Sequence, residues 1–282
     1  MKDKVCIVTG ANSGIGKATA LGLAKLGATI IMVSRNKERG EVAQTEIINK
    51  SENTLVDLFI ADLSLQQSIQ KFASEFKKKY NKLHVLINNA GINPTKRRLT
   101  PEGIEETFAV NVLAPFLLTN LLLDILKASK PARIINVASA VHSKKINFNN
   151  LQGEKRFIHW KVYAQSKVAL ILITYEFARR LMNSGITVNC LHPGGVKTNI
   201  MRDYKGFVKF FGKLFFSFAK SPQEGAETSI YLASSPDVEN ISGKYFIDKE
   251  EAKSKDITYD ELIAKKLWDA SVKLTNVDLD IN

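Results

Sequence analysis

Short apolar runs alternate with segments of helical periodicity along the first half of the chain. The apolar runs predict strands at Val5–Thr9, Ala28–Val33, Leu55–Ile60, Leu83–Asn88 and Arg133–Ala138. The segments between them predict helices following residue 16 and over residues 37–50, 64–80 and 102–127. Strands that alternate with helices indicate a parallel sheet, whose ligands bind beyond the carboxyl ends of its strands. We therefore expect one α/β domain over residues 1–282.

A glycine-rich turn follows the first predicted strand. Gly10, Gly14 and Gly16 stand where the strand passes into a helix, and Asn12, Ser13 and Ile15 complete the turn. Glycines there permit a tight turn and close approach of the backbone to a pyrophosphate, whose charge the helix N-terminus favours. The spacing differs from the usual Gly-x-Gly-x2-Gly fingerprint. The strand before it and the helix after it nevertheless predict a dinucleotide site.

The second predicted strand ends at Ser34, Arg35 and Asn36, about twenty residues past the glycines, where an acidic residue would bind a ribose 2′-hydroxyl. No acid stands there. The guanidinium of Arg35 suits a 2′-phosphate, so we predict NADP(H) rather than NAD(H). A solvated surface charge is the alternative interpretation of Arg35.

Two further strands also end in polar or small residues. Asp62 and Leu63 follow the third, and Asn89, Ala90 and Gly91 follow the fourth. We expect them at the same sheet edge, with Asp62 meeting an adenine. The carboxylate of Asp62 could equally serve as the N-cap of the next helix.

Candidate proton chemistry lies at Tyr163 and Lys167. Residues four apart share one face of a helix, and a lysine ammonium beside a tyrosine favours its phenolate form. Tyr245 and Lys249 have the same spacing without further candidate residues around them, so the pair alone decides little. Ser139 ends the fifth strand and would bring a hydroxyl to the same edge, although serine at a strand end is also common in turns.

Asn111 is a polar residue beside the apolar stripe of the predicted helix over residues 102–127 and needs a hydrogen-bond partner there. Pro115 lacks the N–H that would bond the carbonyl of Asn111, which predicts a kink and frees that carbonyl for a water or a side chain. The alternative is a kink that serves packing only.

Composition narrows the class. The chain has two cysteines, Cys6 and Cys190, both in apolar runs, which predicts buried free thiols and no disulfide framework. The first strand begins too early for a signal peptide, and no apolar run approaches the roughly 18 residues of a membrane span. We therefore expect a soluble or peripheral cytoplasmic protein. The net charge of +12 suits an anionic cofactor or membrane surface, whereas scattered basic residues without a binding motif argue against nucleic acid.

These residues together resemble the short-chain dehydrogenase/reductase family. The motifs occur in the expected order over nearly the whole chain: Thr9-Gly10-x3-Gly14-x-Gly16, Asn88-Asn89-Ala90-Gly91, Asn111, Ser139, Tyr163-x3-Lys167 and Pro193-Gly194. The resemblance implies a Rossmann-type doubly wound parallel sheet of about seven strands, ordered 3-2-1-4-5-6-7, with helices on both faces. His84 stands where the family more often has Asp, and we interpret it as structural.

The resemblance extends to the retinol dehydrogenase branch. Twenty-three residues separate Ser139 from Tyr163, a longer insertion than in most members, and residues 178–181 and a late helix over residues 257–275 fit the same branch. Protochlorophyllide reductases and WW-domain oxidoreductases have similar insertions, but no WW segment exists here. His142 and His159 lie in the insertion, and we interpret them as loop or packing residues.

The family resemblance also implies a mechanism and site residues. Hydride passes between NADP(H) and a carbonyl or alcohol carbon; in reduction Tyr163 donates a proton, Ser139 stabilises the oxyanion, and Lys167 assists Tyr163 and holds the nicotinamide ribose. Asn111 supports a water-linked proton relay. The nicotinamide end would be lined by Pro193, Gly194, Val196 and Thr198. No metal is expected. A non-catalytic NADP(H)-binding regulator is the rival from another class.

The resemblance places residues 200–220 over the substrate pocket as a lid. This segment contains six phenylalanines, and Lys205, Lys209 and Lys213 recur at helical spacing. On a helix, the basic and aromatic residues would occupy separate faces, which suits a membrane interface and a lipophilic substrate. A lid whose aromatics pack on the protein is the alternative. A homo-oligomer is compatible with the sequence.

Overall fold

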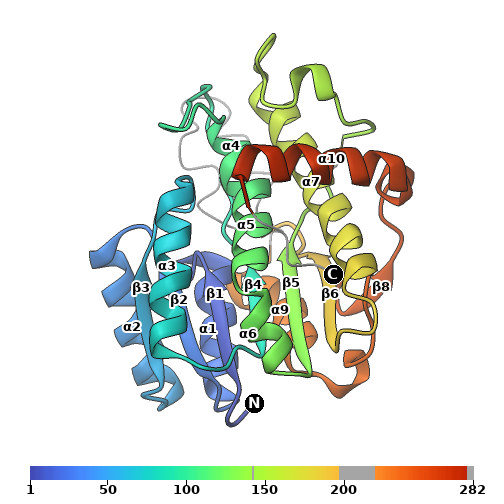
Figure 1. Cartoon of the computed structure of the whole chain (residues 1–282). Coiled ribbons are helices and arrows are strands. Elements are labelled where there is room, and N and C mark those ends of the chain that lie inside the picture. Colours follow the sequence, from blue (N-terminus) through green and yellow to red (C-terminus); the bar gives the residue numbers. More distant parts are fainter. Residues whose placement is uncertain (142, 197–219, 278–282) are drawn as a thin grey trace.

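The structure is a computed structural model that describes residues 1–141, 143–196 and 220–277 (Figure 1). Its strands form one sheet in the order β3-β2-β1-β4-β5-β6-β7-β8. The strands are β1 (Val5–Thr9), β2 (Thr29–Ser34), β3 (Val56–Ile60), β4 (Val85–Asn88), β5 (Ala132–Val137), β6 (Ile186–His192), β7 (Tyr245–Ile247) and β8 (Glu250–Ala252). Neighbours from β3 to β7 are parallel, and β8 runs antiparallel to β7. The predicted order is confirmed, with one short strand added at the edge.

Helices cover both faces of the sheet, so its central strands are apolar on both sides. In β1, Cys6 and Val8 belong to one buried cluster and Ile7 to the other. The first cluster packs under α1 (Gly14–Lys25), α2 (Lys37–Ser51) and α9 (Pro222–Ser234). The second packs under α3 (Gln66–Lys79), α5 (Ala114–Leu121) and α7 (His159–Arg180). The doubly wound layers follow from this alternation.

The helix predicted over residues 102–127 is broken into pieces. It begins later, at α4 (Glu106–Phe108), passes through a π-helical turn at Ala109–Leu113 into α5, and ends in α6 (Leu123–Ala128). The helix starts late because Glu105 is its N-cap: the carboxylate of Glu105 accepts from the N–H groups of Thr107 and Phe108, at 2.9 Å each. The predicted irregularity before Pro115 is present as the π turn.

The C-terminal helix α10 (Glu261–Thr275) crosses α7 (Figure 1), and a 3-10 turn (Asp256–Tyr259) precedes it. Helical structure was predicted from residue 257, but Asp260 ends the 3-10 turn and caps α10 by accepting from the N–H of Ile263. Trp268 anchors the crossing, with its ring 4.7 Å from that of Phe177 and 4.2 Å from the guanidinium carbon of Arg180. Helix α7 is thus held from outside as well as by the sheet.

A chain of buried polar side chains links β4, β5 and α7. Asn88 donates to the side-chain oxygen of Asn136 at 2.9 Å, and Asn136 donates to the hydroxyl of Thr174 at 2.9 Å. Thr174 in turn donates to the carbonyl of Leu170 at 2.7 Å. Because each bond requires one particular pair of atoms to meet, this chain fixes the position of α7 along the sheet.

Candidate active site

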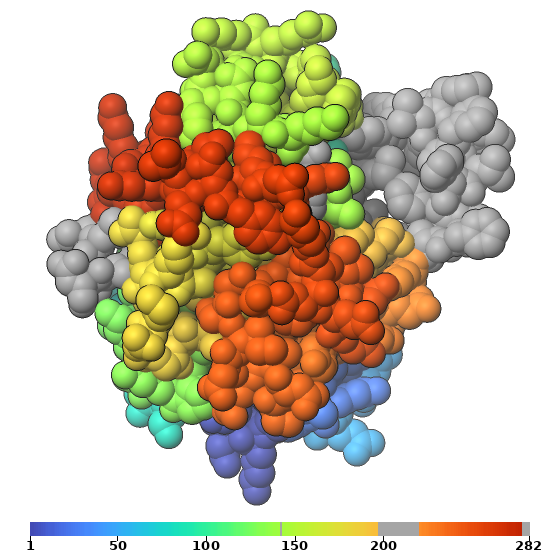
Figure 2. All heavy atoms as spheres, turned by 90° about the vertical axis from the view of Figure 1, so that its right-hand side faces the viewer, coloured from blue at the N-terminus to red at the C-terminus, as the bar shows by residue number. Residues whose placement is uncertain are grey.

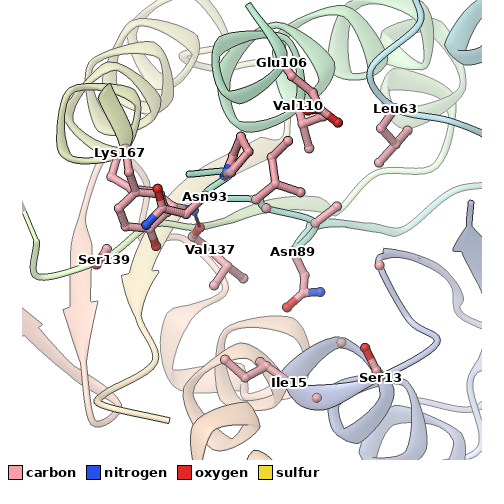
Figure 3. Close-up of a pocket in the computed structure, with 18 of the residues that line it drawn as sticks. Ser13, Ile15, Leu63, Asn89, Asn93, Glu106, Val110, Val137, Ser139 and Lys167 are labelled. Atoms are coloured by element: carbon pink, nitrogen blue, oxygen red, sulfur yellow. Dashed lines mark hydrogen bonds between the residues drawn. The ribbon is translucent and has the colours of Figure 1, made fainter. Parts of the chain in front are cut away.

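A cleft of about 1190 Å³ lies at the carboxyl edge of the sheet (Figure 3) and has room for a dinucleotide. Most of the predicted site residues line it: Gly10, Asn12, Ser13, Gly14, Ile15, Gly16, Arg35, Asn36, Asp62, Leu63, Asn89, Ala90, Gly91, Ser139, Tyr163, Lys167, Pro193, Gly194 and Val196. Ser34 and Asn111 do not line it. Thr198 lies outside the described residues, as does nearly all of the predicted lid.

The glycine turn forms a backbone cradle at the start of α1. Gly10 and Gly14 have φ values of +66° and +55°, which side chains rarely adopt. A Cβ on Gly16 would lie 2.4 Å from the side-chain nitrogen of Asn89 and 2.5 Å from the carbonyl oxygen of Gly10. The turn therefore tolerates no larger residue at position 16 and leaves the first N–H groups of α1 facing the cleft. These residues fit a pyrophosphate.

Thr9 braces this cradle against the loop after β4. Its hydroxyl accepts from the N–H groups of Asn89 and Ala90, at 2.9 and 3.0 Å, and its carbonyl accepts from the Asn89 side chain at 2.8 Å. Thr9 stood in the sequence motif, but the bracing role of its hydroxyl was not predicted. The two loops form one rigid floor.

Arg35 lies at the far end of the cleft with its side chain 58% exposed, 3.9 Å from carboxylate oxygens of both Asp62 and Glu106. Exposure leaves the guanidinium accessible to a ligand. Asn36 accepts from the N–H of Arg39 and caps α2, so its side chain has a structural task. Glu106 and Arg39 also line the cleft, and sequence reasoning missed both.

Asp62 also has a structural role, although not the expected one. Its carboxylate accepts from the N–H and the hydroxyl of Ser64, at 2.9 and 2.7 Å, and so closes a turn. The helix N-cap is Leu65, three residues later. Ser34 is buried behind this edge and donates to the carbonyl of Asn36.

Tyr163 and Lys167 lie on one face of α7, with the lysine nitrogen 5.7 Å from the centre of the tyrosine ring. Lys167 is only 3% exposed and donates to the carbonyl of Val137 at 2.8 Å. Burial disfavours its cationic form and lowers the pKa of Lys167 from 10.5 to about 8. The lowered pKa brings the deprotonation of Lys167 closer to neutral pH than that of an exposed lysine.

Asn111 lies directly behind this pair. Its side chain accepts from the N–H of Ile92 at 2.9 Å and donates to the carbonyl of Ile92 and the hydroxyl of Ser166, at 3.0 Å each. The expected partners of this buried amide are therefore present. These bonds join the loop after β4 to α7, while Pro115 has no N–H to give the backbone carbonyl of Asn111.

Ser139 ends the strand run of β5 and is 7% exposed at the cleft wall (Figure 3). Its hydroxyl oxygen accepts from the N–H of Val141 at 3.0 Å, and its carbonyl accepts from the hydroxyl of Tyr245 at 3.1 Å. An accepting hydroxyl keeps its own hydrogen to donate. Ser139 is thus held in place with a donor at the cleft.

Two of the three histidines that the sequence analysis considered, His84 and His159, lie in the described residues, and a further histidine lines the cleft. His84 accepts from the N–H of Val5 at 3.0 Å, a structural bond, and burial lowers its pKa. His159 begins α7 outside the cleft lining, and His142 lies outside the described residues. His192 lines the cleft and was not predicted.

Cys6 and Cys190 are buried free thiols, as predicted. Burial raises the pKa of Cys6 to about 12. Across the described parts of the chain, no cluster of three or more His, Cys, Asp or Glu side chains could hold a metal ion. Within those same parts, none of the helices has the length and apolar character to cross a membrane.

Comparison with known proteins identifies the class. The family model of the short chain dehydrogenases matches residues 4–207, and the chain belongs to this family. It is accordingly an oxidoreductase of alcohols and carbonyls that uses a nicotinamide dinucleotide and a small-molecule substrate.

Particular relatives cover nearly the whole chain. Retinol dehydrogenase 11 of Mus musculus is 43% identical, over 99% of this chain and 89% of the relative. Polyprenol dehydrogenase of Homo sapiens is 39% identical, over 99% and 87%. Among solved structures, a protein from Mycobacterium paratuberculosis has a TM-score of 0.79 and 30% identity, covering 99% of this chain and 95% of that one. A short chain dehydrogenase of Escherichia coli CFT073 complexed with NADPH has a TM-score of 0.69 and 25% identity, covering 89% and 98%.

Proposed function

We propose that this protein is an NADP(H)-dependent dehydrogenase or reductase that interconverts a lipophilic alcohol and its aldehyde or ketone. The observation that carries the proposal is the convergence of Tyr163, Lys167 and Ser139 on one cleft. The far end of that cleft presents Arg35 where an NAD-binding protein would place an acid.

Each residue has a task that its position supports. Bound NADP(H) would supply or accept the hydride at the carbonyl or alcohol carbon. In reduction, Tyr163 donates its phenolic proton to the carbonyl oxygen, and the Ser139 hydroxyl stabilises the negative charge that develops there. Lys167, with its pKa lowered to about 8, returns a proton toward Tyr163. Asn111 holds the loop after β4 against α7 and keeps these groups in register.

The choice of NADP(H) rests on Arg35 and is supported by solved structures of the family. Two neighbours are complexes with NADPH or NADP. The glycine cradle, Asp62, Leu63 and the loop after β4 would hold the rest of the dinucleotide, and Pro193, Gly194 and Val196 its nicotinamide end.

The substrate class is inferred from the relatives and from the cleft wall. The curated relatives are named for retinol and polyprenol, both long apolar alcohols. Ile92, Val110, Val137, Val141 and Trp160 give the cleft an apolar wall. A non-retinoid carbonyl of the same class remains the alternative within the family, and a non-catalytic NADP(H)-binding regulator is the alternative outside it.

We further propose that residues 200–220 act as the lid over this cleft and contact a membrane interface. Residues 197–219 lie outside the described part of the chain, so the proposal rests on their sequence. Replacing Lys205, Lys209 and Lys213 by Glu should weaken sedimentation with anionic liposomes. Unchanged sedimentation of this variant would refute the membrane half of the proposal.

A substrate panel tests the function. Purified protein should oxidise NADPH with retinoid or long-chain aldehydes at a higher kcat/KM than with short polar ones, and NADPH should be preferred to NADH. Preference for small polar carbonyls would refute the lipophilic substrate. Absence of turnover with every carbonyl, together with tight NADPH binding, would favour the regulator.

A further inference from the structure

The mouth of the cleft carries an exposed surface that mixes basic and apolar side chains, and we call it the rim. It consists of Lys96, Arg97 and Leu99 from the loop after β4 and of Val141, Lys144, Lys145, Lys155, Arg156, Trp160 and Lys161 from the segment between β5 and α7. Figures 1 and 2 place the β5–α7 segment at the end of the molecule opposite the amino terminus. From this surface we infer that the rim docks on an anionic lipid bilayer.

Hydrogen bonds join the two rim segments into one surface. Arg97 donates through Nε to the carbonyl of Gln152 at 3.1 Å, and the side chain of Gln152 accepts from the N–H of Glu105 at 2.8 Å. Gln165 of α7 donates to the carbonyl of Leu151 at 3.0 Å. The backbone that carries the basic side chains is therefore tied to α7 and to the loop after β4, so binding need not order this backbone first.

The charge of the rim suits an anionic surface. The stretch from Val141 to Lys161 contributes five lysines and arginines against one acid, Glu154. Each basic residue that comes near an anionic bilayer multiplies the partition coefficient by roughly five. The apolar members are exposed too, with Leu99 at 52%, Val141 at 52% and Trp160 at 55%.

The mixture of side chains favours a bilayer over an acidic protein or a nucleic acid. Exposed tryptophan among lysines is typical of surfaces that lie at the headgroup level, where the ring enters the acyl boundary and the ammonium groups meet phosphates. The nitrogen of Lys161 lies 5.4 Å from the ring centre of Trp160, so the cation and the aromatic ring lie side by side on the rim. Trp160 and Val141 also line the cleft. Docking would bring the mouth against the lipid, which suits the lipophilic substrate of the proposed function, although the docking itself does not depend on turnover.

Charge reversal tests the electrostatic half with a matched control. Replacing Lys144, Lys145 and Lys155 together by Glu should lower the partition of the protein onto phosphatidylserine-containing vesicles at least about tenfold. None of these three lines the cleft, so turnover of a short, water-soluble carbonyl should be unchanged. In the control, the exposed Lys2, Lys25 and Lys78 at the opposite end are also replaced by Glu. This control changes the net charge by the same amount as the test variant and should leave vesicle binding nearly unchanged.

Intrinsic fluorescence tests the orientation, because the chain has only two tryptophans. Trp160 is 55% exposed, whereas Trp268 is 1% exposed and packed between α7 and α10. Brominated phosphatidylcholine in anionic vesicles should quench Trp160, and the Trp160→Phe variant should lose the quenching while still binding. Trp268 serves as the internal reference.

Three results would overturn the inference. They are failure to bind anionic vesicles at low salt, equal loss of binding in the two triple variants, and binding without quenching of Trp160. In the first of these cases, capture of an acidic protein in place of vesicles would indicate a protein partner. If the protein binds vesicles through the rim but turns over no carbonyl, the docking inference holds and the proposed function is wrong.

Discussion

Lys167 should make the stability of the cofactor-free protein depend on alkaline pH. Its side chain is 3% exposed, and burial lowers the pKa from 10.5 to about 8. Below about pH 8 both the folded and the unfolded chain carry the charge, and the folded chain bears the cost of burying it. Between about pH 8 and 10.5 the folded chain releases the proton first, so the free energy of unfolding rises with pH through this window.

The size of the effect follows from the shift. Each pKa unit corresponds to about 1.4 kcal/mol, so Lys167 alone should add about 3 kcal/mol to the free energy of unfolding across the window. Buried tyrosines and thiols act in the opposite direction, because burial raises the pKa of Tyr245 and of Cys190 and their ionisation favours unfolding. The measured quantity must therefore be a difference from a variant.

The assay is urea denaturation of the wild type and of Lys167→Met from neutral pH to the end of the window. The wild type should gain about 3 kcal/mol relative to the variant. Loss of the donor to Val137 shifts the variant by an amount that does not depend on pH. Lys161→Met, on the exposed side of α7, is the control. The difference in the free energy of unfolding between the wild type and this variant should not change with pH. A difference that stays flat or falls with pH would refute the buried, readily deprotonated Lys167.

Three further predictions concern the cleft. Tyr163→Phe should lower kcat at least about a hundredfold while NADPH affinity, followed by fluorescence, changes only a few-fold, because only the hydroxyl is lost; turnover at the wild-type rate would contradict the assignment. Arg35→Asp should raise the Kd for NADPH about tenfold or more and that for NADH much less; equal wild-type affinity for both cofactors would exclude the role of Arg35. Gly16→Ala should abolish binding of either cofactor and lower Tm, because its Cβ would lie 2.4 Å from the nitrogen of Asn89; a variant that binds normally would show that the cradle yields.

Much of the sheet could be predicted because central parallel strands are apolar on both faces. Val5–Thr9 matches residue for residue, and the other predicted strands are displaced by at most two residues at either end. β8 (Glu250–Ala252) was missed because two of its three residues are glutamates and it forms no apolar run. The start of the helix predicted at residue 102 was wrong, since Leu99 pairs with Glu105 in an isolated bridge and takes those residues out of the helix.

Site residues at the ends of strands could be predicted from the sequence. Site residues that reach the cleft only through the packing of helices could not. The glycine turn and Asn89 follow directly after strands, and Ser139 stands two residues past the end of β5, so their meeting at one edge follows from the topology. Glu106 and Trp160 lie beside the cleft only because α4 and the start of α7 pack there, and no local pattern reports that. The lowered pKa of Lys167 likewise depends on burial that the complete fold creates.

The polar chain from Asn88 through Asn136 to Thr174 shows that the stability of a core and the exact position of a helix in it can have different causes. Replacing all three by apolar residues of similar shape would remove donors and acceptors alike, which can be nearly neutral for stability. Dispersion contacts, however, vary smoothly as a helix slides, whereas a hydrogen bond weakens steeply away from its preferred geometry. Such a protein would unfold near the natural temperature, but α7 would no longer hold Tyr163 at one fixed position along the sheet. The buried amides therefore contribute the position of α7 more than they contribute to the free energy of unfolding.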